Sequence, residues 1–210
     1  MPKTLNKGIS NGVKKHFRKA DPRLFKVLRK IGDLEEISLV PPKEYFSRLC
    51  ENIIGQQLSS KVADTFIERF RALFPRKQIT PERLLKLQDR ALRKIGISWA
   101  KVKYLKDLAQ KVQKKEVLLE DLQRLDDKAV IAHLTRVKGI GNWTAEMFLM
   151  FCLGREDVFS CGDLGLQKAI EEIYKIKNLT KSKAERLSIR WSPYRTYASL
   201  ILWRSREPGV

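Results

Sequence analysis

Residues 137–168 read VKGIGNWTAEMFLMFCLGREDVFSCGDLGLQK, and this stretch decides how the rest of the chain is interpreted. Two glycines one residue apart, Gly139 and Gly141, predict a tight turn just before an apolar-periodic helix. Such a turn lets the backbone approach a phosphate, and the following helix directs its unpaired N–H groups and its dipole at the same anion. A single carboxylate, Asp163, follows Gly162 and precedes another helical pattern. The stretch therefore favours chemistry on a nucleic acid.

The composition narrows the class of protein and partner. The chain has 210 residues, enough for one or two lobes around a buried core. Its 43 lysines and arginines against 24 acidic residues give a formal charge of +19, which favours nucleic acid as partner over a merely well-solvated surface. No apolar run is long enough to cross a bilayer, and no signal peptide is apparent. We therefore expect an intracellular protein without a membrane partner, located in the cytoplasm or nucleoid, or in the nucleus of a eukaryote.

The cysteines and histidines limit the metal chemistry. Cys50, Cys152 and Cys161 show no CxxC spacing, and the only histidines are His16 and His133. Neither a zinc site nor a four-cysteine cluster can be assembled by the usual spacings. An odd number of thiols fits a reducing compartment. We expect no cofactor and no metal ion held by side chains.

Helical periodicity runs through nearly the whole chain. Asp21 and Pro22 supply an N-cap and a first-turn proline, and Ser98 begins a long amphipathic helix. Alternating strand patterns are nearly absent. The pattern predicts an all-α fold, with a basic flexible arm at residues 1–18 and a helical domain at residues 19–210.

Five motifs in order resemble the helix-hairpin-helix DNA glycosylase superfamily. VKGIGNWTA resembles its hairpin, which we place at about residues 134–152, and GDLGLQKAI resembles its catalytic-aspartate segment. IIGQQLS at residues 53–59 resembles the loop that enters the minor groove, and residues 96–109 resemble a further common segment. WSPYRTYA at residues 191–198 resembles the closing segment of the 3-methyladenine DNA glycosylase II branch. The resemblance implies two helical lobes with the active-site cleft between them, in a compact form without the N-terminal β-domain.

The resemblance also implies that Asp163 is the catalytic carboxylate. Positive charge develops on the sugar as an N-glycosidic bond breaks, and a nearby carboxylate stabilises that charge and orients or deprotonates the attacking water. The alternative is that Asp163 only caps its helix. Trp143 stands where family members that also cut the DNA backbone place a lysine for a Schiff base. The implied enzyme is therefore monofunctional and leaves an abasic site.

The implied substrates are alkylated purines such as 3-methyladenine and 7-methylguanine. Such a base is already cationic and departs without a protonated general acid, so its pocket has to recognise an electron-poor ring by stacking and cation–π attraction. The matching positions are Trp143, Met147, Leu164 and Tyr194, with core packing as the alternative for the two aromatic residues. Met147 and Leu164 replace tyrosines that are frequent in the bacterial pattern. A glycosylase for hypoxanthine, uracil or an oxidised purine, and a non-catalytic hairpin DNA-binding protein, remain the competing interpretations.

The implied partner is double-stranded DNA containing damaged bases, bound by a monomer. Gln57 is the expected wedge that fills the space left by the extruded base, with Gln56 and Leu58 as neighbours that share the candidacy. The expected phosphate contacts are Lys138, Gly139, Gly141, Asn142 and Lys168. Lys168 and Arg195 are equally suited to ion pairs within the scaffold. The hairpin carbonyls near Val137 and Gly139 are expected to accept a Na⁺ or K⁺ ion that bridges to the phosphate.

Overall fold

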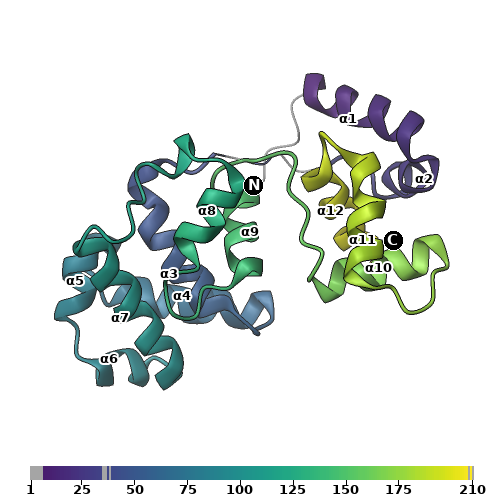
Figure 1. Cartoon of the computed structure of the whole chain (residues 1–210). Helices are drawn as coiled ribbons and strands as arrows, with labels where there is room; N and C mark the ends of the chain where they lie inside the picture. Colours follow the sequence, from purple (N-terminus) through teal and green to yellow (C-terminus); the bar gives the residue numbers. More distant parts are fainter. Residues whose placement is uncertain (1–6, 35–36, 38, 208, 210) are drawn as a thin grey trace. The chain divides into compact units, whose positions relative to one another are not determined.

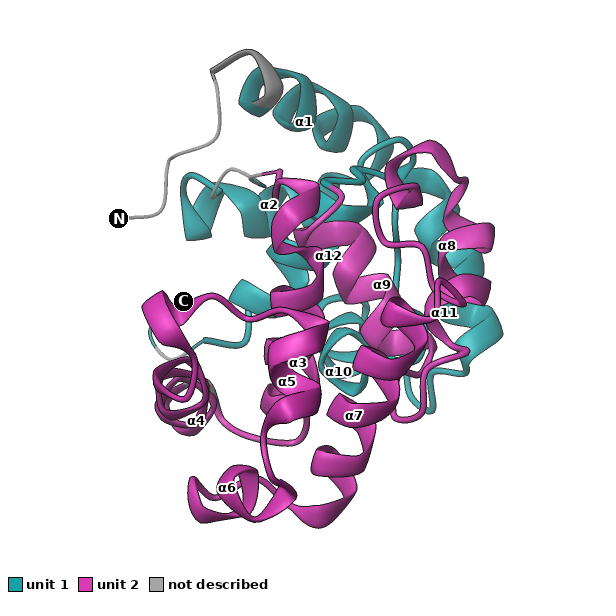
Figure 2. Ribbon diagram, turned by 90° about the vertical axis from the view of Figure 1, so that its left-hand side faces the viewer, with its two compact units in different colours: residues 1–38, 154–210 teal, residues 39–153 magenta. Residues whose placement is uncertain are grey.

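The computed structural model describes residues 7–34, 37, 39–207 and 209, which form α-helices and short 3₁₀ turns but no strand (Figure 1). This confirms the predicted all-α fold. The chain divides into two compact units, which Figure 2 shows in different colours. One consists of residues 39–153, and the other combines residues 1–38 with residues 154–210. Within the described part of the chain, every helix is too short or too polar to span a bilayer.

The unit of residues 39–153 is built around helix α3. Its α-helices are α3 (Tyr45–Gly55), α4 (Ser60–Ala72), α5 (Pro81–Lys86), α6 (Asp89–Lys94), α7 (Trp99–Gln113), α8 (Asp127–Leu134) and α9 (Asn142–Phe151), with 3₁₀ turns η1 (Pro42–Glu44), η2 (Pro75–Lys77) and η3 (Leu122–Arg124). Helix α3 packs against α4, α7 and α9, while α5 packs on α7 and α8 on α9. Tyr45, Leu49 and Ile53 are fully buried at four-residue spacing, so one face of α3 forms the centre of this core.

The discontinuous unit has its own core. Its elements are α1 (Lys7–Ala20), α2 (Pro22–Ile31), α10 (Leu164–Tyr174), α11 (Lys181–Ser188), η4 (Ile189–Trp191) and α12 (Arg195–Arg204). Helix α12 packs against both α2 and α10, and α1 packs against α2 and η4. The buried cluster draws on both parts of the chain, and includes Phe17, Leu24, Leu166, Trp191 and Ile201. Helices α1 and α2 are therefore an integral part of this unit.

Helix α1 occupies most of the segment for which we expected a flexible arm. Residues 7–18 are helical instead, because Val13 and Phe17 lie one turn apart and are buried in the core. Residues 1–6 of the expected arm lie outside the described residues. Lys14, Lys15 and Arg18 therefore belong to a folded helix.

Asp21 fastens α2 to two distant elements. As predicted, it caps α2, and its Oδ1 accepts a hydrogen bond from Leu24 N at 3.1 Å. Its Oδ2 accepts from Tyr174 Oη at 2.5 Å and from Trp191 Nε1 at 2.8 Å. Burial, with the neighbouring Asp21 charge, raises the pKa of Tyr174 well above its ordinary value, so the phenol remains a donor. A buried carboxylate with three donors is satisfied, and it joins α2, α10 and η4.

Other helix starts also follow from local capping. Thr80, Ser98, Asp126 and Thr180 each accept a hydrogen bond from the backbone N–H three residues ahead, at the start of their helices. Ser59 precedes α4 without a side-chain cap bond. Local chemistry therefore places most helix starts to within a residue or two.

Candidate active site

The glycine turn lies between α8 and α9, as the hairpin motif predicts. Gly139 has φ +82°, and a Cβ there would overlap the ring of Tyr104 on α7. Glycine is thus required by both the backbone conformation and the packing. Gly141 precedes α9, and a Cβ on it would meet nothing within 4 Å. Gly141 therefore leaves open space beside the backbone N–H groups of the first turn of α9.

The side chain of Asp107 on α7 fixes the backbone at the start of the glycine turn. Its Oδ2 accepts hydrogen bonds from Lys138 N at 2.8 Å and from Lys111 Nζ at 2.8 Å. Partial burial favours the neutral acid, but these hydrogen bonds and the nearby positive charges outweigh burial and lower the pKa of Asp107. The Lys138 side chain is exposed, with its backbone fixed.

The first turns of α9 present the next candidate residues. Asn142 is exposed at the first helical position, and the Trp143 side chain is 44% exposed. Met147 is half-buried one turn after Trp143, so these two candidate pocket residues share a face of α9. Trp143 thus presents an exposed aromatic surface beside the N-terminus of α9.

The three candidate wedge residues have different surroundings. Gln57 is exposed at the tip of the turn after α3 and has a left-handed backbone, φ +59°. Leu58 is half-buried, and its N–H donates to Gly55 O at 3.2 Å across the turn. Gln56 is half-buried and its Nε2 donates to Gly139 O at 2.8 Å. Of the three, Gln57 is the most accessible.

The hairpin carbonyls named as cation ligands each accept one hydrogen bond. Val137 O accepts from Ile140 N at 3.1 Å, and Gly139 O accepts from the Gln56 side chain. A carbonyl oxygen has two lone pairs, so both can still coordinate a monovalent ion. Among the residues that the structure describes, no group of three or more His, Cys, Asp or Glu side chains could hold a metal ion.

Asp163 lies at the N-terminus of α10 and is half-buried. Its Oδ1 accepts two hydrogen bonds, from Leu166 N at 2.8 Å and from Trp203 Nε1 at 3.1 Å. A Cβ on Gly165 would lie 3.1 Å from that oxygen and 3.4 Å from Trp203 Cδ1. The small residue thus leaves room for the indole beside the carboxylate. The helix cap and the catalytic role are compatible, because the cap bond fixes how the carboxylate is oriented.

Trp203 is a site residue that the sequence interpretation missed. It belongs to α12, 40 residues after Asp163, and its side chain is only half-buried. The available signal was a tryptophan on an apolar helix near the end of the chain, since an indole N–H inside a protein normally needs an acceptor. That signal does not identify the acceptor, and only the fold does.

The remaining candidate pocket residues lie in the same unit as Asp163. Leu164 is 70% exposed at the first position of α10. Tyr194 is half-buried and meets the ring of His16 on α1, with centroids 5.4 Å apart and planes at 69°. A Cβ on Gly12 would lie 3.1 Å from Tyr194 Oη. Helix α1 therefore supports this tyrosine.

Of the two basic residues with alternative roles, Arg195 forms a scaffold ion pair. Its Nε lies 2.8 Å from Asp157 Oδ1 and its Nη2 lies 3.1 Å from Oδ2. Ser192 Oγ also donates to Asp157, at 2.7 Å. Partial burial opposes ionisation, but these hydrogen bonds and the Arg195 charge together lower the pKa of Asp157. Lys168 is exposed on α10.

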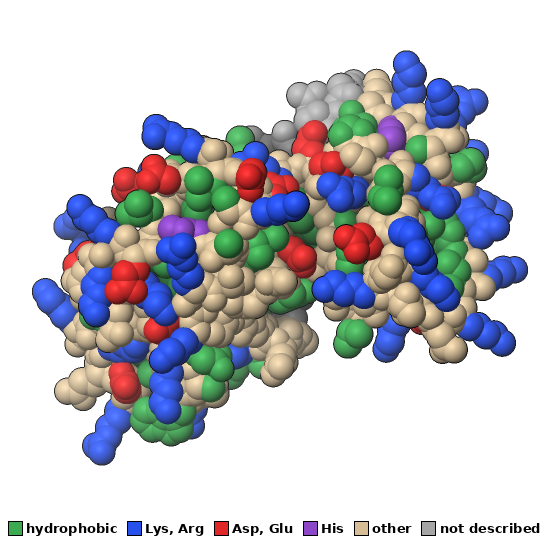
Figure 3. Space-filling model, in the orientation of Figure 1, with side chains coloured by type: hydrophobic (Ala, Val, Ile, Leu, Met, Phe, Trp, Pro, Cys, Tyr) green, Lys and Arg blue, Asp and Glu red, His purple; other side chains and the backbone are tan. Residues whose placement is uncertain are grey.

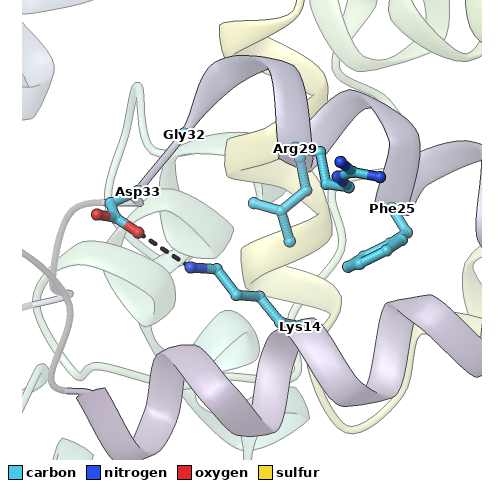
Figure 4. Close-up of a pocket in the computed structure, with 6 residues that line it drawn as sticks. Lys14, Phe25, Arg29, Gly32 and Asp33 are labelled. Carbon is cyan, nitrogen blue, oxygen red and sulfur yellow. Dashed lines mark hydrogen bonds and ion pairs between the residues drawn. The ribbon is translucent and has the colours of Figure 1, made fainter.

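The surface and the hollows give the wider setting. Lysine and arginine side chains are spread widely over the face shown in Figure 3. A hollow between α1 and α2 is lined by Lys14, Phe25, Leu28, Arg29, Gly32 and Asp33, with Lys14 Nζ 3.1 Å from Asp33 Oδ1 (Figure 4). It contains none of the predicted site residues. The hairpin and the turn after α3 belong to the unit of residues 39–153, and Asp163 belongs to the discontinuous unit.

These features together define a helix-hairpin-helix protein in which the Asp163 carboxylate lies at the start of the next long helix after the hairpin. The chain matches the model of the HhH-GPD superfamily base excision DNA repair proteins over residues 50–193. It belongs to this superfamily.

Individual relatives extend the match over most of the chain. DNA-3-methyladenine glycosylase 1 of Schizosaccharomyces pombe is 29% identical over 195 residues, which cover 91% of this chain and 86% of that protein. A solved 3-methyladenine DNA glycosylase from the same yeast, in complex with abasic DNA, superposes with a TM-score of 0.83 at 29% identity, over 92% of this chain and 95% of that one. A DNA-3-methyladenine glycosidase from Bacillus halodurans superposes with a TM-score of 0.77 at 35% identity, over 92% and 88%.

Proposed function

We propose that this protein is a monofunctional DNA glycosylase that excises alkylated purines, such as 3-methyladenine and 7-methylguanine, by hydrolysis of the N-glycosidic bond. The observation that carries the proposal is Asp163, a single carboxylate held at the start of α10 by two hydrogen bonds to one oxygen. The membership of the superfamily and the names of the relatives support the same reaction and the same class of lesion. The product is DNA with an abasic site.

The chemistry needs one carboxylate. As the bond to the base breaks, the sugar acquires oxocarbenium character, and the Asp163 carboxylate stabilises the positive charge and orients the attacking water. An alkylated purine carries its own positive charge, so it leaves without a proton from the enzyme. The hydrogen bonds from Leu166 N and Trp203 Nε1 fix one oxygen, which orients the carboxylate for this task.

The absence of a lyase step is proposed from Trp143. An indole cannot form the Schiff base through which a lysine at this position would cut the backbone. Its exposed ring is suited to stack on an electron-poor base, a contact of ~0.5–2 kcal/mol. Met147, Leu164 and Tyr194 complete the proposed set of pocket residues. With two aliphatic members, this set selects by shape and apolar contact as well as by stacking.

The proposed grip on DNA combines the hairpin with the turn after α3. The open backbone at Gly141 and Asn142 receives one phosphate, with Lys138 beside it and Lys168 as a further phosphate contact. A Na⁺ or K⁺ ion on the carbonyls near Val137 and Gly139 would bridge the hairpin to that phosphate. Gln57 is the proposed wedge because it is exposed at the tip of its turn. We propose that the protein acts as an intracellular monomer on double-stranded DNA.

A panel of duplexes, each with one defined lesion, tests the function. We expect release of 3-methyladenine and 7-methylguanine by the wild-type protein, with alkali-labile sites formed in equal amount and no strand cleavage before alkali. Asp163→Asn should abolish release while binding to an abasic duplex is retained. Near-wild-type turnover by Asp163→Asn would refute the assignment, and trapping of a covalent complex by borohydride would refute the monofunctional mechanism. Release of only hypoxanthine, uracil or an oxidised purine would redirect the proposal to that lesion.

A further inference from the structure

The turn between α3 and α4 has a strained tip. Gln56 has φ −50° and ψ 132°, Gln57 has φ +59°, and Leu58 N donates to Gly55 O, which together make a type II turn. The third position of such a turn favours glycine, and a left-handed glutamine costs on the order of 1 kcal/mol. Neighbouring contacts must therefore hold this conformation.

The side chain of Gln56 supplies one of these contacts. Its Nε2 donates to Gly139 O at 2.8 Å and to Thr144 Oγ1 at 3.1 Å. Gly139 belongs to the glycine turn, and Thr144 is buried in the first turn of α9, next to Trp143. One amide group thus bonds the turn after α3 to the hairpin and to the helix that follows it.

Helix α7 supplies a second contact through Lys101. Its Nζ donates to Ile54 O and to Gln56 O, both at 2.7 Å, at the carbonyl end of α3. A cation at this end complements the helix dipole. Burial lowers the pKa of Lys101. The backbone on both sides of Gly55 is therefore fixed by the same ammonium group.

One face of α7 supports both DNA-contacting segments. Lys101, Tyr104, Asp107 and Lys111 recur at spacings of three and four, which places them on one side of the helix. Lys101 bonds to the turn after α3, and the Tyr104 ring packs on Gly139. Asp107 accepts a hydrogen bond from the backbone N–H of Lys138, the residue before Gly139. The turn after α3 and the hairpin are thus both supported by α7, and Gln56 links them directly.

We infer that Gln56 is a positioning residue that couples the phosphate grip of the hairpin to the insertion of the neighbouring Gln57, and is not itself an intercalating residue. The inference rests on the proposed function. Extrusion of a base costs a few kcal/mol. A wedge residue offsets this cost only if it keeps a fixed position relative to the DNA phosphate that the hairpin binds. The Gln56 amide holds the turn that carries Gln57 in place against the hairpin, because it donates to the carbonyl of Gly139 in the glycine turn.

Gln56→Met tests the coupling, because methionine keeps the length of the side chain and removes both donors. Excision should be measured under single-turnover conditions with 7-methylguanine in a fully paired duplex and with the same lesion in an unpaired bulge. We expect the excision rate to fall about tenfold on the paired duplex, the equivalent of ~1.4 kcal/mol. In the bulge it should fall less than threefold, because the base is already unpaired and its extrusion costs less. Exposed Gln110→Met on α7 is the matched control and should match the wild type on both substrates.

A second variant keeps the test decisive if Gln56→Met is poorly folded. Thr144→Val removes the weaker of the two acceptors without changing the size of the side chain, so it should show a smaller loss with the same preference for the bulge. In the double variant the losses should not add, since both changes break one contact. Wild-type excision of the paired lesion by Gln56→Met, or equal losses on the two substrates, would overturn the inference. A wild-type protein that releases no alkylated base from either substrate would instead overturn the proposed function.

Discussion

At the scale of single residues, Trp203 has the clearest consequence for catalysis. It donates to the same Asp163 oxygen that receives the helix-cap bond, so the carboxylate is oriented by one local and one distant donor. The local bond follows from the sequence motif. The distant bond requires α12 to pack against α10, which no local pattern specifies.

Trp203→Phe keeps the aromatic ring and removes the donor. A hydrogen bond to a charged group contributes ~1.5–3 kcal/mol, so single-turnover excision should fall by at least about tenfold. The melting temperature should stay within about 3 °C of the wild type, because the packing is largely retained. Trp99→Phe, at an exposed tryptophan of the other unit, is the control and should change neither measurement. Undiminished excision by Trp203→Phe would show that this bond does not orient the catalytic group.

Gln57 allows backbone strain to be separated from function. Gln57→Gly relieves the left-handed backbone, so the melting temperature should be unchanged or up to about 3 °C higher, whereas the loss of the wedge should lower excision from a paired duplex. Lys115→Gly is the matched control, because Lys115 is exposed with φ +60° in the same unit. It should show the same thermal effect with unchanged excision. Full excision activity in Gln57→Gly would exclude Gln57 as the wedge.

At the scale of elements, the link between α8 and the chain after α7 depends on pH. Leu118 N donates to His133 Nε2 at 2.8 Å, so this ring nitrogen must be unprotonated. Burial, reinforced by the Arg136 charge, lowers the pKa of His133. The bond therefore contributes stability above the ordinary pKa near 6.5, and this contribution is lost as the pH falls through the lower pKa of the folded state.

His133→Ala measures that contribution. At pH 8 the variant should be less stable than the wild type by ~1 kcal/mol in denaturant unfolding, and the difference should shrink at pH 5. His16→Ala is the contrasting control, since His16 Nε2 donates to Arg190 O and this nitrogen does not act as an acceptor. Its cost should persist at pH 5. An equal effect of His133→Ala at both pH values would contradict the assigned acceptor role.

At the scale of the whole molecule, the motifs predicted two lobes, but which segments combine within each unit depends on contacts between residues far apart in the sequence. Caps such as Asp21 and Ser98 bond to an N–H three residues later, so the starts of these helices can be predicted from neighbouring residues. Asp21 also bonds to Tyr174 and Trp191, which are 153 and 170 residues away. The position of Gln56 against Gly139 is of the same kind, with 83 residues between the partners. Motif order supplied the candidate site residues, including Gln57 as the expected wedge, whereas the support of the hairpin by Gln56 and of Asp163 by Trp203 depends on such distant contacts.

The net charge of +19 belongs to the whole molecule, and its effect is measurable as counterion release. Each phosphate neutralised on duplex DNA contributes about −0.9 to the slope of log K against log salt, so a footprint of about five phosphates predicts a slope near −4.5. Affinity should then fall several hundredfold between 50 and 200 mM KCl. Single-turnover excision at saturating protein should stay constant, because salt weakens the encounter with DNA and does not act on the bond-breaking step.

Lys138→Gln should make the slope of log K against log salt shallower by about 0.9, the contribution of one phosphate, if the hairpin lysine contacts DNA. Lys77→Gln, at a lysine paired with Glu68 at 3.3 Å, is the control and should leave the slope unchanged. A slope shallower than about −1 for the wild type would mean that its positive surface takes little part in binding the duplex.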